Sequence, residues 1–222
     1  MRGGTWGGRT AAERRAERRS RFIDATIGIW REDGWAAVSK RRVCALTGIN
    51  DRYFYEEFTD LDGLLVAAWE SVRDDMLSVI AEVYRQSQGE RPDVIAHRAA
   101  AEIVDRLAAD PAYGRILLMH HGGSPKLEVC RSTAVQMTSD LVVIAAQRFL
   151  PPDADQKQIR MAAIFGVGGF VELVSAWQSG VFDGTAKDIV DHVDALVQTF
   201  AQTYFTPGSI GEFSLADAAD NP

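Results

Sequence analysis

Residues 38–58, VSKRRVCALTGINDRYFYEEF, carry the side chains whose types and spacing are most specific in this chain of 222 residues. Cationic, amide and hydroxyl groups of this kind bind the phosphates and base edges of nucleic acids by charge and hydrogen bonding. The candidate contacts are Ser39, Lys40, Arg41, Arg42, Asn50, Arg52, Tyr53 and Tyr55. The segment is therefore a candidate for DNA binding.

Two short helices would have to position these side chains. The first is predicted to start after Ser39 and to end before Gly48, and the second to run from Asn50 to about Phe58. Gly48 supplies the positive φ of a tight turn, and such a unit places the start of its second helix in the major groove of DNA. The predicted helix-turn-helix core comprises Val43, Cys44, Leu46, Gly48, Ile49, Phe54 and Phe58.

The stretch over residues 18–69 resembles the N-terminal domain of the TetR family of transcriptional repressors. That family's motif reads roughly Thr, Ile-Ala, Ala-Gly-Val-Ser, Tyr-x-x-Phe and Lys-Glu-x-Leu-Leu. The corresponding residues, in the same spacing, are Ser39, Val43-Cys44, Thr47-Gly48-Ile49-Asn50, Tyr55-Glu56-Glu57-Phe58 and Leu61-Asp62-Gly63-Leu64-Leu65. The resemblance implies an operator-binding homodimer that a small-molecule effector, bound in a largely apolar pocket, releases from a palindromic site.

This sequence departs from the family pattern in its charges. Leu61 replaces a Lys that in many relatives grips the DNA backbone, while Asp51, Glu56 and Glu57 add negative charge near the predicted DNA-binding face. An alternative function is therefore an all-α small-molecule-binding protein with weak or lost DNA binding. Tyr53 and Tyr55 also fit a second role, that of covering the first helix.

The charge of the chain is distributed unevenly. The formal net charge is −7, but residues 1–60 hold 12 basic and 9 acidic side chains, whereas residues 61–222 hold 12 and 22. Six Arg and two Glu lie within residues 9–21. This arginine run either binds phosphate or forms a solvated helix face. The acidic total argues against non-specific coating of nucleic acid, and the basic head favours local, salt-sensitive binding.

Helical periodicity and capping signals predict an all-α fold of about nine helices. The first helix is expected over residues 11–33, and Asp60, Pro92, Asp110-Pro111, Ser124-Pro125 and Thr185 mark later starts. The predicted domains are a flexible arm (1–10), a helix-turn-helix DNA-binding domain (11–65), a helical effector-binding and dimerisation domain (66–206) and a flexible tail (207–222).

The penultimate helix predicts a subunit interface. Over residues 161–182 the only charged side chain is Glu172. A helix that is apolar all round must be buried on more than one face. Together with an apolar stripe on the final helix, it would form a four-helix bundle between two copies. The candidate interface residues are Phe170, Val174, Val193, Leu196, Val197 and Phe200. A monomer with one oversized core is the alternative.

Residue type alone selects the candidates for the effector pocket, and each also suits an ordinary core: Trp69, His97, Met119, His120, Met137, Phe165 and Trp177. No catalytic motif, metal site or cofactor site is predicted, so the chain is not expected to be an enzyme. Cys44 and Cys130 cannot form a disulfide framework. With no signal-peptide pattern, and with an apolar run over residues 161–171 that is too short to span a bilayer, a cytoplasmic protein is expected.

Overall fold

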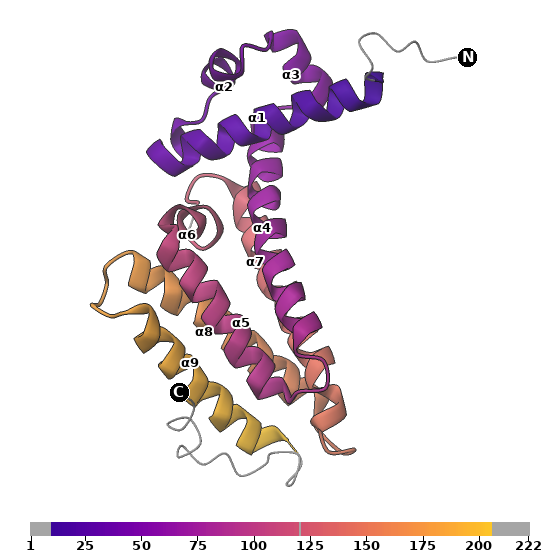
Figure 1. Cartoon of the computed structure of the whole chain (residues 1–222), viewed down its shortest axis with the longest axis vertical. Coiled ribbons are helices and arrows are strands. Elements are labelled where there is room, and N and C mark those ends of the chain that lie inside the picture. The colour runs from indigo at the N-terminus through magenta and orange to yellow at the C-terminus, as the bar shows by residue number, and fades with distance from the viewer. Residues whose placement is uncertain (1–9, 120, 206–222) are drawn as a thin grey trace. The chain divides into compact units, whose positions relative to one another are not determined.

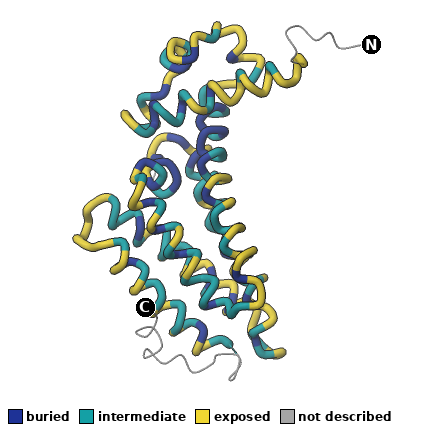
Figure 2. Tube along the Cα trace, in the orientation of Figure 1, coloured by how far each residue is buried: buried dark blue, intermediate teal, exposed yellow. Residues whose placement is uncertain are grey.

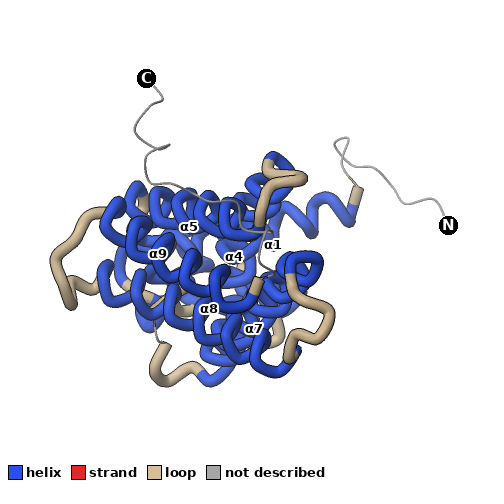
Figure 3. Tube along the Cα trace, turned by 90° about the horizontal axis from the view of Figure 1, so that it is seen from below, coloured by secondary structure: helices blue, strands red, loops and turns tan. Residues whose placement is uncertain are grey.

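The computed structural model describes residues 10–119 and 121–205, and within them the chain forms nine α-helices, two short 3-10 helices and no strand (Figures 1 and 3). The all-α prediction is confirmed. The helices are α1 (Ala11–Asp33), η1 (Trp35–Ala37), α2 (Lys40–Thr47), α3 (Asp51–Glu57), α4 (Leu61–Gln86), α5 (Pro92–Ala109), α6 (Pro111–Leu117), α7 (Pro125–Ala146), η2 (Gln147–Phe149), α8 (Gln156–Gln178) and α9 (Ala186–Tyr204). Apart from Thr10, the predicted arm and tail lie outside the described residues.

Two compact units make up the chain, and their division differs from the predicted boundary after residue 65. One unit comprises Met1–Leu77 and Asp110–Ser132, and the other comprises Ser78–Ala109 and Thr133–Pro222. Helix α6 belongs with the first unit because polar contacts join it to α1. The Arg31 guanidinium lies 2.7 Å from the Asp110 carboxylate, and Arg115 donates to the Arg31 carbonyl at 2.8 Å.

Side-chain caps fix the starts of the first helices. Thr10 and Glu13 form a reciprocal capping box at the start of α1. The Ser39 hydroxyl accepts from the Arg42 N–H at 3.3 Å, and the Asn50 side chain accepts from the Arg52 N–H at 2.9 Å. Between α2 and α3, Gly48 has φ +66°, the left-handed conformation that lets the chain turn sharply.

An aromatic cluster packs α3 against α1. Phe22 lies 5.8 Å from Phe54 and 6.2 Å from Phe58 in edge-to-face contacts, measured between ring centroids. All three rings are buried, as is Val43 of α2. The N-terminal half of α4 is also largely buried and is drawn dark blue in Figure 2. The core of the first unit therefore joins four helices.

In the second unit α5 and α9 lie side by side and make the most extensive helix contact (Figures 1 and 3). Asp93 lies between them with its side chain 1% exposed. Arg91 contacts this carboxylate at 2.6 Å, and Gln198 of α9 donates to it at 3.3 Å. The buried charge is thus paired and hydrogen-bonded, which is the condition under which such a group is tolerated.

Helix α8 leaves much of its apolar surface uncovered. Met161, Ile164 and Phe165 are 56%, 42% and 82% exposed. By length and composition alone α8 could cross a membrane, although core helices of soluble proteins pass the same test, and only 17% of its most apolar window is buried. The apolar run over residues 161–171, which is too short to span a bilayer, lies within this longer helix of 23 residues.

Replacement of Phe54 tests the aromatic cluster. Phe54→Ala should lower the free energy of unfolding by about 3–5 kcal/mol, because it removes a buried ring and leaves a cavity. Urea denaturation followed by circular dichroism would measure the change. Tyr55→Ala is the matched control, since its exposed ring should cost under about 0.5 kcal/mol. Equal effects of the two substitutions would contradict this packing.

Candidate nucleic-acid interface

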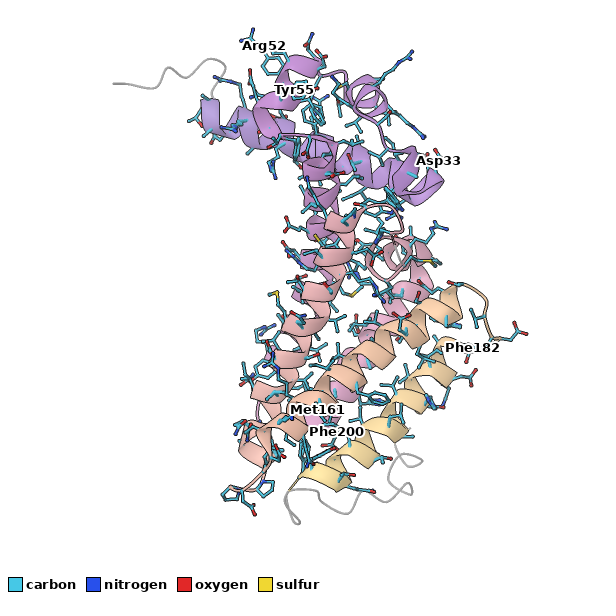
Figure 4. The ribbon with its side chains drawn as sticks, turned by 180° about the vertical axis from the view of Figure 1, so that it is seen from behind. Asp33, Arg52, Tyr55, Met161, Phe182 and Phe200 are labelled. Carbon is cyan, nitrogen blue, oxygen red and sulfur yellow. The ribbon has the colours of Figure 1, made fainter. Side chains whose placement is uncertain are left out.

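Helix α3 presents its predicted contact residues to solvent. The Arg52 side chain is 84% exposed, and Tyr53 and Tyr55 are 41% and 61% exposed. Figure 4 shows Arg52 and Tyr55 on this helix. Asn50 caps its first turn and is itself exposed. An amide, a guanidinium and phenols on one short helix can donate to base edges and phosphates.

Lys40 of α2 joins this surface through Tyr55. Its ammonium donates to the Tyr55 hydroxyl at 3.2 Å, lies 4.7 Å from the ring centroid and contacts the Asp51 carboxylate at 3.4 Å. The hydrogen bond to Tyr55 is the largest cause of a raised Lys40 pKa, and the attraction of Asp51 adds to it. Lys40 therefore stays cationic at neutral pH.

The other predicted residues of α2 differ from one another. Ser39 uses its hydroxyl as the cap of α2, and Arg41 is exposed. The Arg42 guanidinium forms an ion pair with the Asp33 carboxylate at the end of α1. Arg41 is thus the better placed cation of this run, while Lys40 and Arg42 would have to share their charges with Asp51 and Asp33.

Ion pairs neutralise the acidic side chains that the sequence placed near this surface. Glu57 is 1% exposed, and its carboxylate lies 3.1 Å from Arg15 and 3.4 Å from Arg18. Glu56 lies 3.7 Å from both Arg18 and Arg52. With Asp51 paired to Lys40, each of the three carboxylates has a cationic partner, which weakens their repulsion of phosphate.

The arginine run of α1 supplies those partners and also caps helix ends. Arg15 donates to the Glu56 carbonyl at 2.8 Å and Arg19 to the Glu57 carbonyl at 2.9 Å, while Arg21 donates to the Thr47 carbonyl at the end of α2. The last carbonyls of a helix lack internal partners and favour nearby cations. We call Arg15, Arg18 and Arg19 the arginine clamp.

Sequence reasoning missed the arginine clamp, although a signal was present. Arg15, Arg18, Arg19 and Phe22 are spaced i, i+3, i+4 and i+7, which places them on one face of a helix. Phe22 on that face packs on Phe54 and Phe58. The same face should therefore have been expected to meet α3.

The structure buries or half-buries most of the residues predicted for the helix-turn-helix core. Val43, Phe54 and Phe58 are buried, and Cys44 and Ile49 are half-buried. Leu46 is a correction, since it is 63% exposed. Thr47 instead shares the inward face of α2 with Val43 and donates to its carbonyl at 2.9 Å. Burial raises the pKa of the Cys44 thiol, which keeps it protonated and poorly nucleophilic.

The described residues predicted for the effector pocket do not line one cavity together. A cavity of about 250 Å³ lies between α5 and the end of α4 and is lined mainly by polar residues, including Arg98, Glu102 and Asp105. Of the seven candidates only His97 lines it, and its ring contacts Asp194 at 3.1 Å. This polar lining differs from the apolar pocket that the resemblance implies.

The remaining pocket candidates lie elsewhere. Phe165 and Met137 are corrections, because their side chains are 82% and 52% exposed rather than enclosed. Trp69 is buried in the first unit, and Trp177 donates to the Gly184 carbonyl at 2.9 Å. Met119 is half-buried after α6. His120 lies outside the described residues.

One candidate for the subunit interface is wrong. Val174 is 0% exposed within its own chain and cannot contact a partner, because it faces the interior side of α8. Leu196 is 55% exposed, and Phe170, Val193, Val197 and Phe200 are half-buried.

Among the described residues no group of three or more His, Cys, Asp or Glu could hold a metal ion.

Comparison with known proteins identifies the fold. No protein-family model and no curated protein matches the sequence. Solved structures do match, among them a TetR-family transcriptional regulator from Mesorhizobium loti, with 17% identity, a TM-score of 0.63 and coverage of 87% of this chain and 99% of that one. The chain has the TetR-family fold.

Two further structures of the TetR-family fold carry ligands. The transcriptional regulator FadR from Bacillus subtilis, in complex with stearoyl-CoA, has 14% identity, a TM-score of 0.61 and coverage of 80% of this chain and 96% of that one. The multidrug binding protein EbrR, complexed with imidazole, has 20% identity, a TM-score of 0.63 and coverage of 87% and 96%. At these identities the likeness establishes the fold alone.

Removal of the buried carboxylate tests the ion pairs. Glu57→Gln should lower the free energy of unfolding by about 1–3 kcal/mol, because it removes charge-assisted contacts to Arg15 and Arg18. Glu56→Gln is the control and should cost under about 1 kcal/mol, since its carboxylate is more exposed. Thermal unfolding at low salt would measure both, and an order reversed between the two would refute the assignment of the buried partner.

Proposed function

We propose that the chain is a TetR-like transcriptional regulator, acting as a repressor that a small-molecule effector releases from a palindromic operator. The observation that carries this proposal is the exposed start of α3, where Asn50, Arg52 and Tyr55 are accessible and the nearby carboxylates are paired. The alternative of lost DNA binding rested on these carboxylates and on Leu61. The pairing of the carboxylates removes the first of these two grounds.

In the proposed complex each subunit inserts the start of α3 into a major groove. The two α3 helices of a dimer would lie about 34 Å apart, one turn of DNA, so that both read one face of the duplex. Lys40 and Arg41 would bind phosphates and fix the register, while Asn50 and Arg52 would read base edges. A net charge of −7 for the whole chain limits binding to this local surface.

A second copy of the chain is the partner that we propose for the apolar face of α8. Met161, Ile164 and Phe165 occupy positions i, i+3 and i+4, so they share one exposed face. Leu196 and Phe200 of α9 would contribute to the same bundle, and Figure 4 labels Met161 and Phe200 on their helices. Covering this surface would give a soluble, cytoplasmic dimer rather than a membrane protein.

The effector would bind in the helical part that follows the DNA-binding head. Support comes from the ligand complexes of FadR and EbrR, which have the same fold. To release the operator, the effector must bind one spacing of the two heads more tightly than the other. A coupling free energy of about 1–3 kcal/mol would weaken operator binding roughly 5–150-fold.

The double substitution Arg52→Ala with Tyr55→Ala tests the DNA-binding surface. It should weaken binding to the operator by at least about tenfold, because direct contacts are lost, while thermal stability changes little since both side chains are exposed. Fluorescence anisotropy on a duplex that the wild-type protein selects from a random library would measure affinity. Tyr84→Ala, an exposed tyrosine of α4 far along the sequence, is the control.

The same experiment separates the two functions. A wild-type protein that selects no duplex at low salt would exclude the regulator and support the small-molecule-binding alternative. Large destabilisation with intact DNA binding would show instead that Arg52 and Tyr55 serve the packing of α3.

Phe165→Glu tests the proposed dimer. A charge in the centre of an apolar interface should raise the dissociation constant of the dimer by at least about a hundredfold, because the carboxylate would have to be buried unpaired. Sedimentation velocity over a range of concentrations would measure it, with Tyr84→Glu as the control. A wild-type protein that is monomeric, or that sediments with membranes, would exclude this use of α8.

A further inference from the structure

We propose that Arg18, at the centre of the arginine clamp, is a positioning residue that orients the DNA-reading side chains of α3 without binding DNA itself. This inference rests on the proposed function for its DNA arm. The first observation is the contact of Arg18 with Tyr53. The guanidinium carbon lies 4.8 Å from the centroid of the Tyr53 ring, within the range of a cation–π interaction. A stacked guanidinium restricts the rotation of that ring.

Arg18 also reaches Arg52 through a shared carboxylate. Glu56 lies 3.7 Å from Arg18 on one side and 3.7 Å from Arg52 on the other. Arg52 and Glu56 are one helical turn apart on α3, so the carboxylate can hold the Arg52 guanidinium against the helix. Arg18 draws that carboxylate towards α1, and its position therefore affects how far Arg52 can extend.

The rest of the arginine clamp fixes the other end of α3. Arg15 and Arg19 donate to the carbonyls of Glu56 and Glu57 at 2.8 and 2.9 Å, and the Arg19 guanidinium lies 4.5 Å from the Phe58 ring centroid. The Glu57 carboxylate, which is 1% exposed, forms ion pairs with both Arg15 and Arg18. A carboxylate at a helix C-terminus is disfavoured by the helix dipole, and these cations offset it.

The arginine clamp differs from a phosphate-binding arm because its guanidinium groups already contact groups of the same chain. The Arg18 side chain is only 25% exposed, and its group contacts Tyr53, Glu56 and Glu57 at once. Binding a phosphate would require it to leave these partners. Arg41, which is exposed on α2, is the contrasting residue and is assigned a phosphate contact.

The first test needs no DNA. Hydrogen exchange measured by mass spectrometry on the full chain should show about tenfold faster exchange across residues 51–58 in Arg18→Gln, because α3 opens more often. Arg41→Gln should leave these amides unchanged. Helices α5 and α9 are the internal reference, and unchanged exchange in α3 of Arg18→Gln would overturn the proposal whatever the protein does with DNA.

The second test compares the same variants on the selected duplex and on a scrambled duplex. Arg18→Gln should bind the selected duplex roughly tenfold more weakly, with its salt slope unchanged and its preference over the scrambled duplex reduced. Arg41→Gln should weaken binding to both duplexes alike and lower the salt slope by about one. Failure of the wild-type protein to select any duplex would count against the proposed function, while the exchange test still decides the role of Arg18.

Arg18→Lys keeps the positive charge but removes the planar guanidinium, which stacks on the Tyr53 ring and contacts two carboxylates at once. A positioning role therefore predicts that Arg18→Lys resembles Arg18→Gln in both tests. Near-normal affinity of Arg18→Lys, together with a salt slope lowered by about one in Arg18→Gln, would identify a phosphate contact and overturn the proposal. Faster exchange in α5 and α9 of Arg18→Gln would indicate general unfolding. In that case the proposal is decided by Arg18→Lys, whose near-normal affinity would overturn it.

Discussion

A helix of seven residues cannot maintain its own shape in water, because nucleation is costly and two turns contain few internal hydrogen bonds. Helix α3 is such a helix, yet it carries the side chains on which the proposed recognition depends. Its shape is supplied by α1, which packs Phe22 against Phe54 and Phe58 and binds the last carbonyls of α3 with arginines. Apolar packing and charged contacts therefore act together at the C-terminal end of α3.

The electrostatics of this head follow from that arrangement. A count of charges over the sequence suggests that Asp51, Glu56 and Glu57 oppose the arginine run across a DNA-binding surface. In the structure these charges are partners, and each carboxylate faces a cation within 3.7 Å. Most of the basic side chains of residues 10–60 that the structure describes are engaged by groups of the same chain. The local excess of positive charge thus contributes to the packing of this head.

The sequence predicted helix starts well because capping is a local effect. Ser39, Asn50, Asp110 and Thr185 each accept a hydrogen bond from an N–H within three residues, so the boundaries required no knowledge of tertiary structure. The order of the candidate contact residues along α2 and α3 was predictable for the same reason, since it follows from where these helices start.

Side-chain environments were predicted less well because they depend on partners that are distant in the sequence. Leu46 is exposed because Thr47 shares the inward face of α2 with Val43. Val174 and Phe165 lie on opposite sides of α8, a distinction that an all-apolar helix does not reveal. Helix α6 joins the first unit through Arg31 and Asp110, which are separated by 79 positions. No periodicity in the sequence encodes such a pair.

The uncovered face of α8 also affects how a newly synthesised copy of the chain avoids aggregation. A newly made copy exposes Phe165 and Met161 until something covers them, and exposed apolar surface of this kind favours aggregation. Under the proposed dimer, folding and association are linked by mass action, so apparent stability would rise with concentration. At low concentration such a chain would therefore require a tight association to keep this surface covered.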